Sequence, residues 1–211
     1  MKYFSNFPKL ITKDLNGNVT LGTNLLARVN FIPSLLNNPS LFYTYEYQDE
    51  DKPEIIANKY YSNPYRYWMF LYGNNIMDPQ WDLPLSSRNF DVYLNDKYAS
   101  EANTAHQTVL EYTQSTVKYY KKVVTTFDSI SQTTTINEFN VDLETYNNLP
   151  VNLVTTKSFP SGSYVTVTQT KREQNIYDYE LQTNEDKREL RVIDKKYAEG
   201  LEQKLQSLMS I

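Results

Sequence analysis

The clearest hydrophobic pattern in the chain predicts two short helices in immediate succession. The first has a buried stripe at helical spacing, formed by Ile55, Ile56 and Tyr60. Asp51 is the expected N-cap of this helix, and Glu54 three residues later would complete a capping box. The first helix is therefore predicted to cover roughly two turns.

The second predicted helix begins at Asn63 and Pro64, a polar cap followed by a residue suited to the first helical turn. Gly73 is expected to end it in a left-handed turn. Neither helix is long enough to persist alone in water, so we expect the pair to pack on a neighbouring strand. The apolar positions of the second helix are Tyr65, Trp68, Leu71 and Tyr72.

The supporting strand is predicted at residues 41–47, directly before the helices. Tyr43, Tyr45 and Tyr47 alternate with other residues along it and so share one face. The strand and the helices predict a small module, which we place at residues 41–100 together with a third helix. The cap and the apolar face of the third helix are expected at Ser86 or Ser87, Phe90, Tyr93, Leu94 and Tyr98.

Beyond residue 100 the pattern changes from helical spacing to alternation. Residues 99–105 contain few apolar positions and are interpreted as a linker. Residues 101–172 are rich in Thr, Val, Tyr and Asn and predict an antiparallel sheet of roughly three to five strands. The strand residues are expected in Val117–Phe127, in Phe139, Val141 and Leu143, and in Tyr164, Val165 and Val167.

The two ends of the chain complete a predicted α+β fold. Residues 1–40 are interpreted as an extended N-terminal arm with a helical patch at residues 24–29. Residues 173–211 are predicted to be helical, and Asn184 is expected to open the last segment of this range. One side of the C-terminal helix is expected to be buried, at Tyr197, Leu201, Leu205 and Leu208.

Composition excludes several classes of function. The net charge is −4 and the pI about 5.1, so no basic field is expected for a nucleic-acid backbone. Cysteine is absent, which excludes disulfides and cysteine metal sites. Five glycines do not form a phosphate loop. No apolar run reaches the ~18 residues of a membrane span and no signal peptide is recognised, so we expect a soluble protein made in a cytoplasm.

Candidate catalytic residues are few. His106 is the only histidine and stands in a polar stretch, so we expect it to be solvated or packed. Glu46, Glu54, Asp78 and Asp82 could supply the carboxylate pair of a glycosidase, but caps and solvated faces are the favoured interpretation. We therefore predict no catalytic residue, no metal site and no cofactor.

Aromatic residues are the most distinctive part of the composition, with 19 Tyr, 9 Phe and 2 Trp. Tyrosine and tryptophan combine a large apolar surface with a polar tip, which suits both cores and protein interfaces. Their ring faces could also stack on sugars, but helical spacing favours packing and protein contact. The interface candidates are Tyr65, Tyr67, Trp68, Tyr72 and Trp81.

An ordered set of short motifs runs through the helices and returns near the C-terminus. The first motifs are Lys52-Pro53-Glu54-Ile55-Ile56-Ala57, Tyr61-Ser62-Asn63-Pro64, Tyr67-Trp68, Asn74-Asn75 and Asp78-Pro79. Others are Trp81, Pro84-Leu85-Ser86, Phe90, Lys97-Tyr98, Tyr179-Glu180, Asn184-Glu185 and Lys187-Arg188. In this order they resemble the baseplate wedge subunits of contractile-tailed phages (myoviruses) that contain a LysM-like domain. The likeness covers about the first hundred residues and the last forty, and residues 108–170 match nothing in it.

The resemblance implies a structural virion protein of the viral baseplate and not an enzyme. It implies a LysM-like β-α-α-β module, to which the residue pattern adds an N-terminal arm, a β-rich antiparallel middle segment and a C-terminal helix. Members of the family help to join neighbouring wedges into a six-fold ring during tail assembly. Their partners are other baseplate wedge proteins, including wedge backbone subunits and a lysozyme-like sheath initiator, with neither nucleic acid nor membrane. The expected location is the tail baseplate of the virion, assembled in the host cytoplasm.

The alternative is a peptidoglycan-binding LysM module of a tail-associated protein. A LysM domain that binds glycan usually has a Gly-Asp-Thr-like turn before its first helix. Residues 48–52 read Gln-Asp-Glu-Asp-Lys here, which is a departure from that turn. This departure favours use of the fold for docking to protein over binding to glycan.

Overall fold

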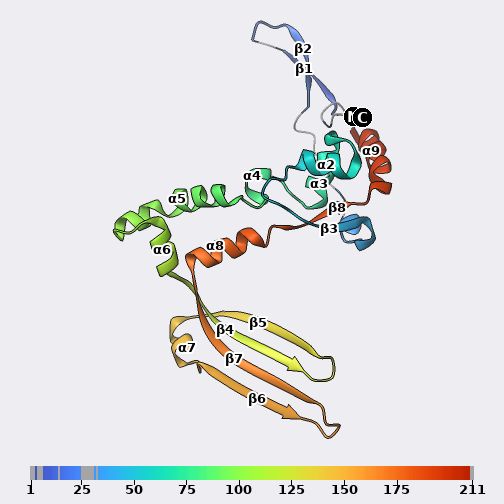
Figure 1. Ribbon diagram of the computed structural model, residues 1–211. Coiled ribbons are helices and arrows are strands. Elements are labelled where there is room, and N and C mark those ends of the chain that lie inside the picture. Colours follow the sequence, from blue (N-terminus) through green and yellow to red (C-terminus); the bar gives the residue numbers. More distant parts are fainter. Residues whose placement is uncertain (1–2, 4–6, 14, 25–30, 32, 210–211) are drawn as a thin grey trace. The chain divides into compact units, whose positions relative to one another are not determined.

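The computed structural model describes residues 3, 7–13, 15–24, 31 and 33–209. This part of the chain is α+β, with antiparallel sheets and a C-terminal helix (Figure 1). It forms two compact units. The first joins residues up to 88 with those from 184 onward, and the second is Asn89–Thr183. Both ends of the chain thus belong to one unit, whereas the sequence pattern divides the chain into four successive segments.

The first unit is built on a two-stranded antiparallel sheet whose strands are far apart in the sequence. Strand β3 (Phe42–Glu46) pairs with strand β8 (Glu189–Ile193). Sequence analysis assigns helix to residues 173–211, so β8 is a correction. The reason lies in its own period, since Leu190 and Val192 alternate with charged residues and are buried at 9% and 0% exposure.

The two predicted helices pack with this sheet in one core. Helix α2 (Pro53–Tyr61) and helix α3 (Tyr67–Gly73) are joined by the 3-10 turn η3 (Pro64–Arg66). Burial of each large apolar side chain contributes on the order of 2 kcal/mol, which is what holds such short helices in place. The largest fully buried apolar side chains are Phe70, Ile56, Met69, Ile193 and Val192.

The start of α2 differs from the predicted capping box. Lys52 occupies the N-cap position and makes no capping hydrogen bond with its side chain. Asp51 instead accepts hydrogen bonds from the Tyr45 hydroxyl at 2.6 Å and from the Gln48 amide at 2.9 Å. Asp51 therefore closes the turn before the helix and does not cap it.

The predicted ends of the second helix are partly correct. Asn63 accepts a hydrogen bond from the Tyr65 amide at 3.0 Å, as a cap of the turn that precedes α3. The left-handed conformation falls on Asn75, with φ 55°, and not on Gly73. Gly73 is needed for close packing, because a Cβ there would lie 3.3 Å from the ring of Phe42.

The C-terminal helix α9 (Lys195–Met209) is also part of the first unit. Its buried residues are Ala198, Leu205 and Met209, and Leu201 packs against the core from a half-buried position. The predicted stripe is therefore only partly buried, since Tyr197 and Leu208 are 36% and 49% exposed.

The remaining elements of the first unit are short. Strands β1 (Lys9–Lys13) and β2 (Val19–Thr23) form a hairpin within the predicted arm. The others are α1 (Pro33–Leu36), the 3-10 turn η2 (Pro39–Leu41) and α4 (Pro79–Asp82). The helical patch predicted at residues 24–29 falls almost entirely on residues 25–30, which lie outside the described residues.

Three helices of the second unit are α5 (Ser87–Thr104), α6 (Val109–Ser115) and α8 (Ile176–Glu185). The first residues of α5 and the last residues of α8 belong to the first unit. Helix α5 is the predicted third helix, extended to Thr104. The prediction of a linker at residues 99–105 is wrong, because Ala102 continues the buried stripe of α5 by one more turn. That stripe consists of Phe90, Leu94, Tyr98 and Ala102.

A four-stranded antiparallel sheet in the order β5-β4-β7-β6 forms the rest of the second unit. It confirms the predicted β-rich middle. Leu143 is a correction, since it begins the short helix α7 (Leu143–Asn148) after Asp142, whose carboxylate caps that helix. The strands are β4 (Val117–Asp128), β5 (Thr133–Val141), β6 (Asn152–Ser158) and β7 (Tyr164–Asn175).

Candidate functional site

Trp68, at the centre of the predicted interface, is a core residue of the first unit. Its side chain is 4% exposed. The ring of Tyr3 stacks on it with 5.9 Å between centroids, and the rings of Phe31 and Tyr72 lie at 6.2 and 6.1 Å. Aromatic pairs at these distances add to the stability gained by burial. Trp68 therefore holds the N-terminal residues against α3.

Tyr67 and Tyr72 lie at the border of the same cluster and are half-buried. The hydroxyl groups of Tyr3 and Tyr72 are hydrogen-bonded to each other. Burial raises the pKa of Tyr3, and the hydrogen bond with Tyr72 raises it further. Burial also raises the pKa of Tyr67. The phenol of Tyr3 therefore stays protonated near neutral pH and acts as a hydrogen-bonding core group.

Tyr65 and Trp81 are the two predicted interface residues that face outward. Their side chains are 45% and 55% exposed. Trp81 lies in α4, which Asp78 caps through a 3.0 Å hydrogen bond from the Gln80 amide. The structure thus separates the five candidates into a buried Trp68, half-buried Tyr67 and Tyr72, and an exposed pair.

Asn74 joins α3 to β8 through hydrogen bonds in both directions. Its Nδ2 donates to the Arg191 carbonyl, its Oδ1 accepts from the Arg191 amide, and both distances are 2.8 Å. The guanidinium of Arg191 in turn donates to the carbonyls of Gly73 and Leu36. Asn74 belongs to the motif set seen in the sequence, and its role here is to attach the C-terminal strand.

Asn184 and Arg188 make similar contacts to the first hundred residues. Asn184 accepts from the Leu85 amide at 2.7 Å and donates to the Leu85 carbonyl at 3.0 Å. Arg188 lies 2.7 Å from the carboxylate of Asp49 and donates to the Tyr47 carbonyl. The hydrogen bond from Arg188 lowers the pKa of Asp49. The two distant groups of motifs therefore meet in one unit.

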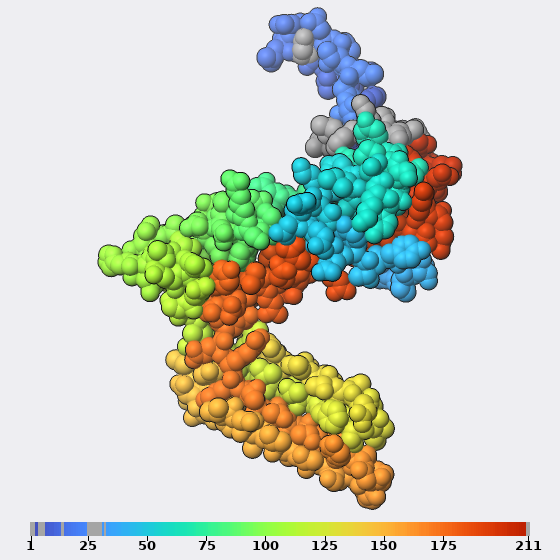
Figure 2. Space-filling model, viewed as in Figure 1, coloured from blue at the N-terminus to red at the C-terminus, as the bar shows by residue number. Residues whose placement is uncertain are grey.

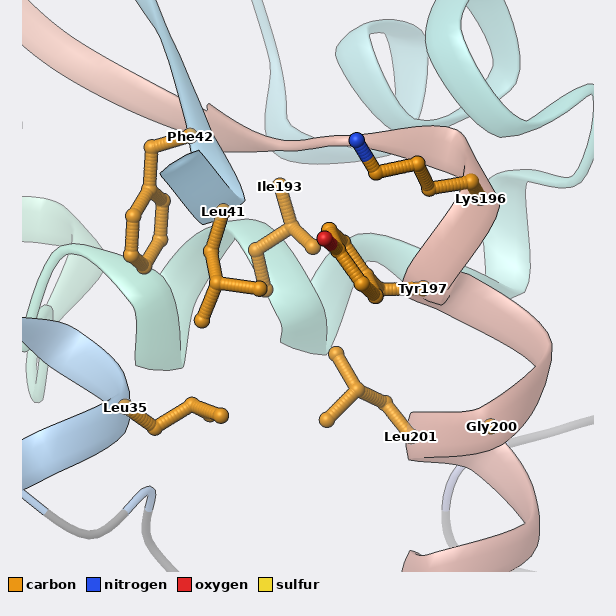
Figure 3. A pocket seen from close by; sticks show the side chains of 8 residues that line it. All are labelled: Leu35, Leu41, Phe42, Ile193, Lys196, Tyr197, Gly200 and Leu201. Atoms are coloured by element: carbon orange, nitrogen blue, oxygen red, sulfur yellow. The ribbon is translucent and has the colours of Figure 1, made fainter. Parts of the chain in front are cut away.

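An apolar groove lies between α1, the β3–β8 sheet and α9 and has a volume of about 220 Å³ (Figure 3). The side chains of Leu35, Leu41, Ile193 and Leu201 gather around it, and the ring of Tyr197 lies beside Ile193. A Cβ added at Gly200 would meet no atom within 4 Å, so the α9 wall is open at that point. The groove is large enough for one or two apolar side chains. Sequence spacing places Tyr197 and Leu201 on one face of the C-terminal helix, but it does not predict the groove.

A buried carboxylate in the second unit was not predicted. Glu180 is 4% exposed and accepts hydrogen bonds from the Tyr98 hydroxyl at 2.5 Å, the Tyr93 hydroxyl at 2.9 Å and the Lys97 ammonium at 2.9 Å. Burial alone would raise its pKa, but the three hydrogen bonds outweigh burial and the pKa is lowered. A fixed, fully partnered anion of this kind joins α5 to α8. The motif Lys97-Tyr98 contains two of its three partners, and the motif Tyr179-Glu180 contains the carboxylate itself.

Two of the carboxylates considered for catalysis accept hydrogen bonds from backbone amides. Asp78 caps α4, and Asp82 accepts from the Met77 and Asp78 amides, which lower its pKa. Glu46 and Glu54 are exposed, as is His106 in the turn after α5. Among the described residues no group of three or more His, Asp or Glu side chains could hold a metal ion.

Comparisons with known proteins do not assign the chain to a family. Within the part of the chain that the structure describes, no helix is long and apolar enough to cross a membrane. No protein-family model matches the chain, and a search of curated proteins found no similar sequence.

Proposed function

We propose that this chain is a structural subunit of the baseplate wedge in a contractile phage tail. In this role it docks to other wedge proteins and helps to join neighbouring wedges into a six-fold ring. Its partners are wedge backbone subunits and the lysozyme-like sheath initiator, and its location is the virion.

The observation that carries the proposal is the meeting of the two separated motif groups in the first unit. Asn74 binds β8, Asn184 binds the backbone of Leu85, and Arg188 binds Asp49. Three of the residues that carry the resemblance thus help to assemble the strand, two helices and returning strand into one body. A structural subunit needs such residues to hold its fold, and they carry out no chemistry.

The docking surface in this proposal is smaller than the aromatic set suggests. Trp68 is buried in the core, so Tyr65 and Trp81 are the candidate residues whose side chains are exposed for docking. Exposed aromatic side chains of this kind contribute much of the affinity when they enter a partner's pocket. The apolar groove beside α9 offers a complementary recess for a partner's side chain.

Purified virions provide the direct test. Mass spectrometry of isolated tails is expected to find this chain at a copy number that is a multiple of six. Tagged protein from infected cells is expected to purify with the wedge backbone subunits and the sheath initiator. Virions that lack the chain altogether would refute the proposal.

Single alanine variants test the docking surface. Tyr65→Ala and Trp81→Ala are expected to reduce co-purification with wedge proteins about tenfold or more while the chain stays folded. Val92→Ala and Leu110→Ala, whose side chains are 54% and 52% exposed, are the matched controls. Equal recovery with all four variants would show that the docking surface lies elsewhere. Trp68→Ala is unsuitable, since loss of a buried Trp costs about 3–5 kcal/mol.

The strand–helix–helix–strand order also favours a second candidate, a module that binds peptidoglycan. The turn before α2 is closed in this chain, because Asp51 binds Tyr45 and the Tyr47 hydroxyl donates to the Asp51 carbonyl at 2.6 Å. We expect no co-sedimentation with purified peptidoglycan. Pelleting with it at low salt would favour this candidate over docking to protein.

A further inference from the structure

The four-stranded sheet of the second unit has no second layer within that unit. Of the residues in its four strands, all of which the structure describes, only Gln174 is buried. In the space-filling view the strands form one broad, continuous surface (Figure 2). A sheet with apolar side chains is stable when one face is covered by another layer. This sheet therefore lacks a layer that another molecule can supply.

The register of the strands assigns side chains to the two faces. We call one the neutral face, defined by Val123, Phe127, Ile136, Val154 and Tyr164. The other is the lysine face, defined by Lys122, Phe139, Leu153, Lys157 and Lys171. Side chains alternate strictly along each strand, so that each set lies on one side.

Charge separates the two faces. Lys122 and Lys171 lie directly opposite each other on the lysine face, where like charges oppose the approach of an identical surface. Lys171 also lies over the ring of Tyr146 in α7, which covers that end of the face. With Glu173, Asp128 and Lys157 on the same face, charged groups run along its whole length.

The charged groups of the neutral face are confined to one end of it, where two cations share one carboxylate. Lys121 and Arg172 lie 2.9 and 2.7 Å from the carboxylate of Glu138. These ion pairs lower the pKa of Glu138, chiefly through the hydrogen bond from Lys121. Beyond them, from Val123 to the hairpin turns, the strand residues of the neutral face are apolar side chains, threonines and other uncharged groups.

We infer that the neutral face binds the neutral face of a second copy of this chain, so that two sheets pack face to face about a two-fold axis. In an isologous contact the same surface of both copies meets, and the uncharged part of the neutral face, from Val123 to the hairpin turns, permits this without opposing like charges. Twisted sheets pack in this way with their strands roughly aligned. Ile136 and Val154, 62% and 56% exposed, would be covered.

The size of the face fits a stable dimer. Strands of 12, 9, 7 and 12 residues, at about 3.3 Å per residue and about 4.8 Å between strands, give a flat area of about 600 Å². Because side chains make the surface uneven, its accessible area is larger than this flat area. It approaches the roughly 800 Å² that each partner contributes to a standard interface.

Light scattering during size-exclusion chromatography of the purified full chain tests the inference without other tail proteins, and so independently of the proposed function. The chain is expected to be a dimer that dissociates on dilution within about 0.1–100 µM. The double variant Ile136→Lys and Val154→Lys is expected to weaken dimerisation about a hundredfold or more. A monomer at the highest concentration would overturn the inference.

The opposite face provides a matched control on the same two edge strands. Phe139→Lys with Leu153→Lys changes residues that are 53% and 45% exposed and is expected to leave the dimer intact. Ile136→Thr with Val154→Thr, which keeps strand-forming side chains, should weaken the dimer without risk to folding. A dimer that survives both neutral-face variants, or one that only the lysine-face pair disrupts, would contradict the inference.

Discussion

At the scale of single residues, two glycines in the first unit have opposite roles. Gly200 lies in the middle of α9 with open space around it, so Gly200→Ala is expected to raise the free energy of unfolding by about 1 kcal/mol. Gly73→Ala is expected to lower it, because the new Cβ would lie 3.3 Å from Phe42. Tryptophan fluorescence during urea unfolding measures both. Equal effects of the two substitutions would contradict this account.

Glu180 is the residue on which the helical part of the second unit depends most. Glu180→Ala would leave Lys97 and the hydroxyls of Tyr93 and Tyr98 without their common acceptor. We expect a loss of about 3 kcal/mol, at the low end for a buried charge pair because the Lys97 side chain is 42% exposed. Circular dichroism during urea unfolding measures it. Glu101→Ala on exposed α5 surface is the control and should change little.

The same carboxylate gives the second unit a pH dependence. Because the pKa of Glu180 is lowered below its ordinary 4.5 in the folded chain, folding is favoured whenever the group is ionised. This stability is fully present above pH 4.5 and is lost as the pH falls through the folded pKa. Unfolding by urea at a series of acid pH values should show the decline. In Glu180→Gln that part of the decline should disappear, and an unchanged profile would argue against it.

At the scale of elements, the attachment of β8 to α3 depends on one side chain. Asn74→Ala leaves the amide and the carbonyl of Arg191 without their partners and is expected to cost about 2 kcal/mol. Asn58→Ala on the exposed surface of α2 is the control and is expected to be neutral or slightly stabilising. Hydrogen exchange of the β8 amides should accelerate in the first variant alone.

Elements with a strong local pattern could be predicted from the sequence. Helical spacing predicts that Ile56, Trp68 and Phe90 face the core, and these residues are buried in α2, α3 and α5. Val117–Phe127 is a run of residues that favour strands, and it forms most of β4. In such segments burial and period agree, so the physical cause of the element is contained within it.

Elements that depend on distant partners could not be predicted from the sequence. Strand β8 is only five residues long, so its alternation is too short to decide between strand and helix without the pairing with β3. The place of Trp68 likewise depends on Tyr3, which lies 65 positions earlier and covers it. Its local spacing is the same for a core residue and for an interface residue. The groove beside α9 and the Glu180 cluster are products of the same long-range packing.

At the scale of the whole molecule, two units in one chain should unfold in two steps. Both tryptophans, Trp68 and Trp81, belong to the first unit, whereas the four-stranded sheet belongs to the second. Tryptophan fluorescence therefore reports the first unit, and circular dichroism reports both. We expect the two signals to give different midpoints in urea, since separate units do not behave as one two-state system. Coincident transitions would show that the units unfold together.

The pairing of β3 with β8 also sets an order in time. Phe42 lies opposite Ile193, and the whole second unit is made between them. A ribosome therefore releases α2 and α3 long before the strand that completes their sheet exists. Folding of the second unit draws its ends together and shortens the loop that the returning strand must close. The first unit is completed only after the second unit has been made, so a partner that recognises it rejects chains truncated before β8.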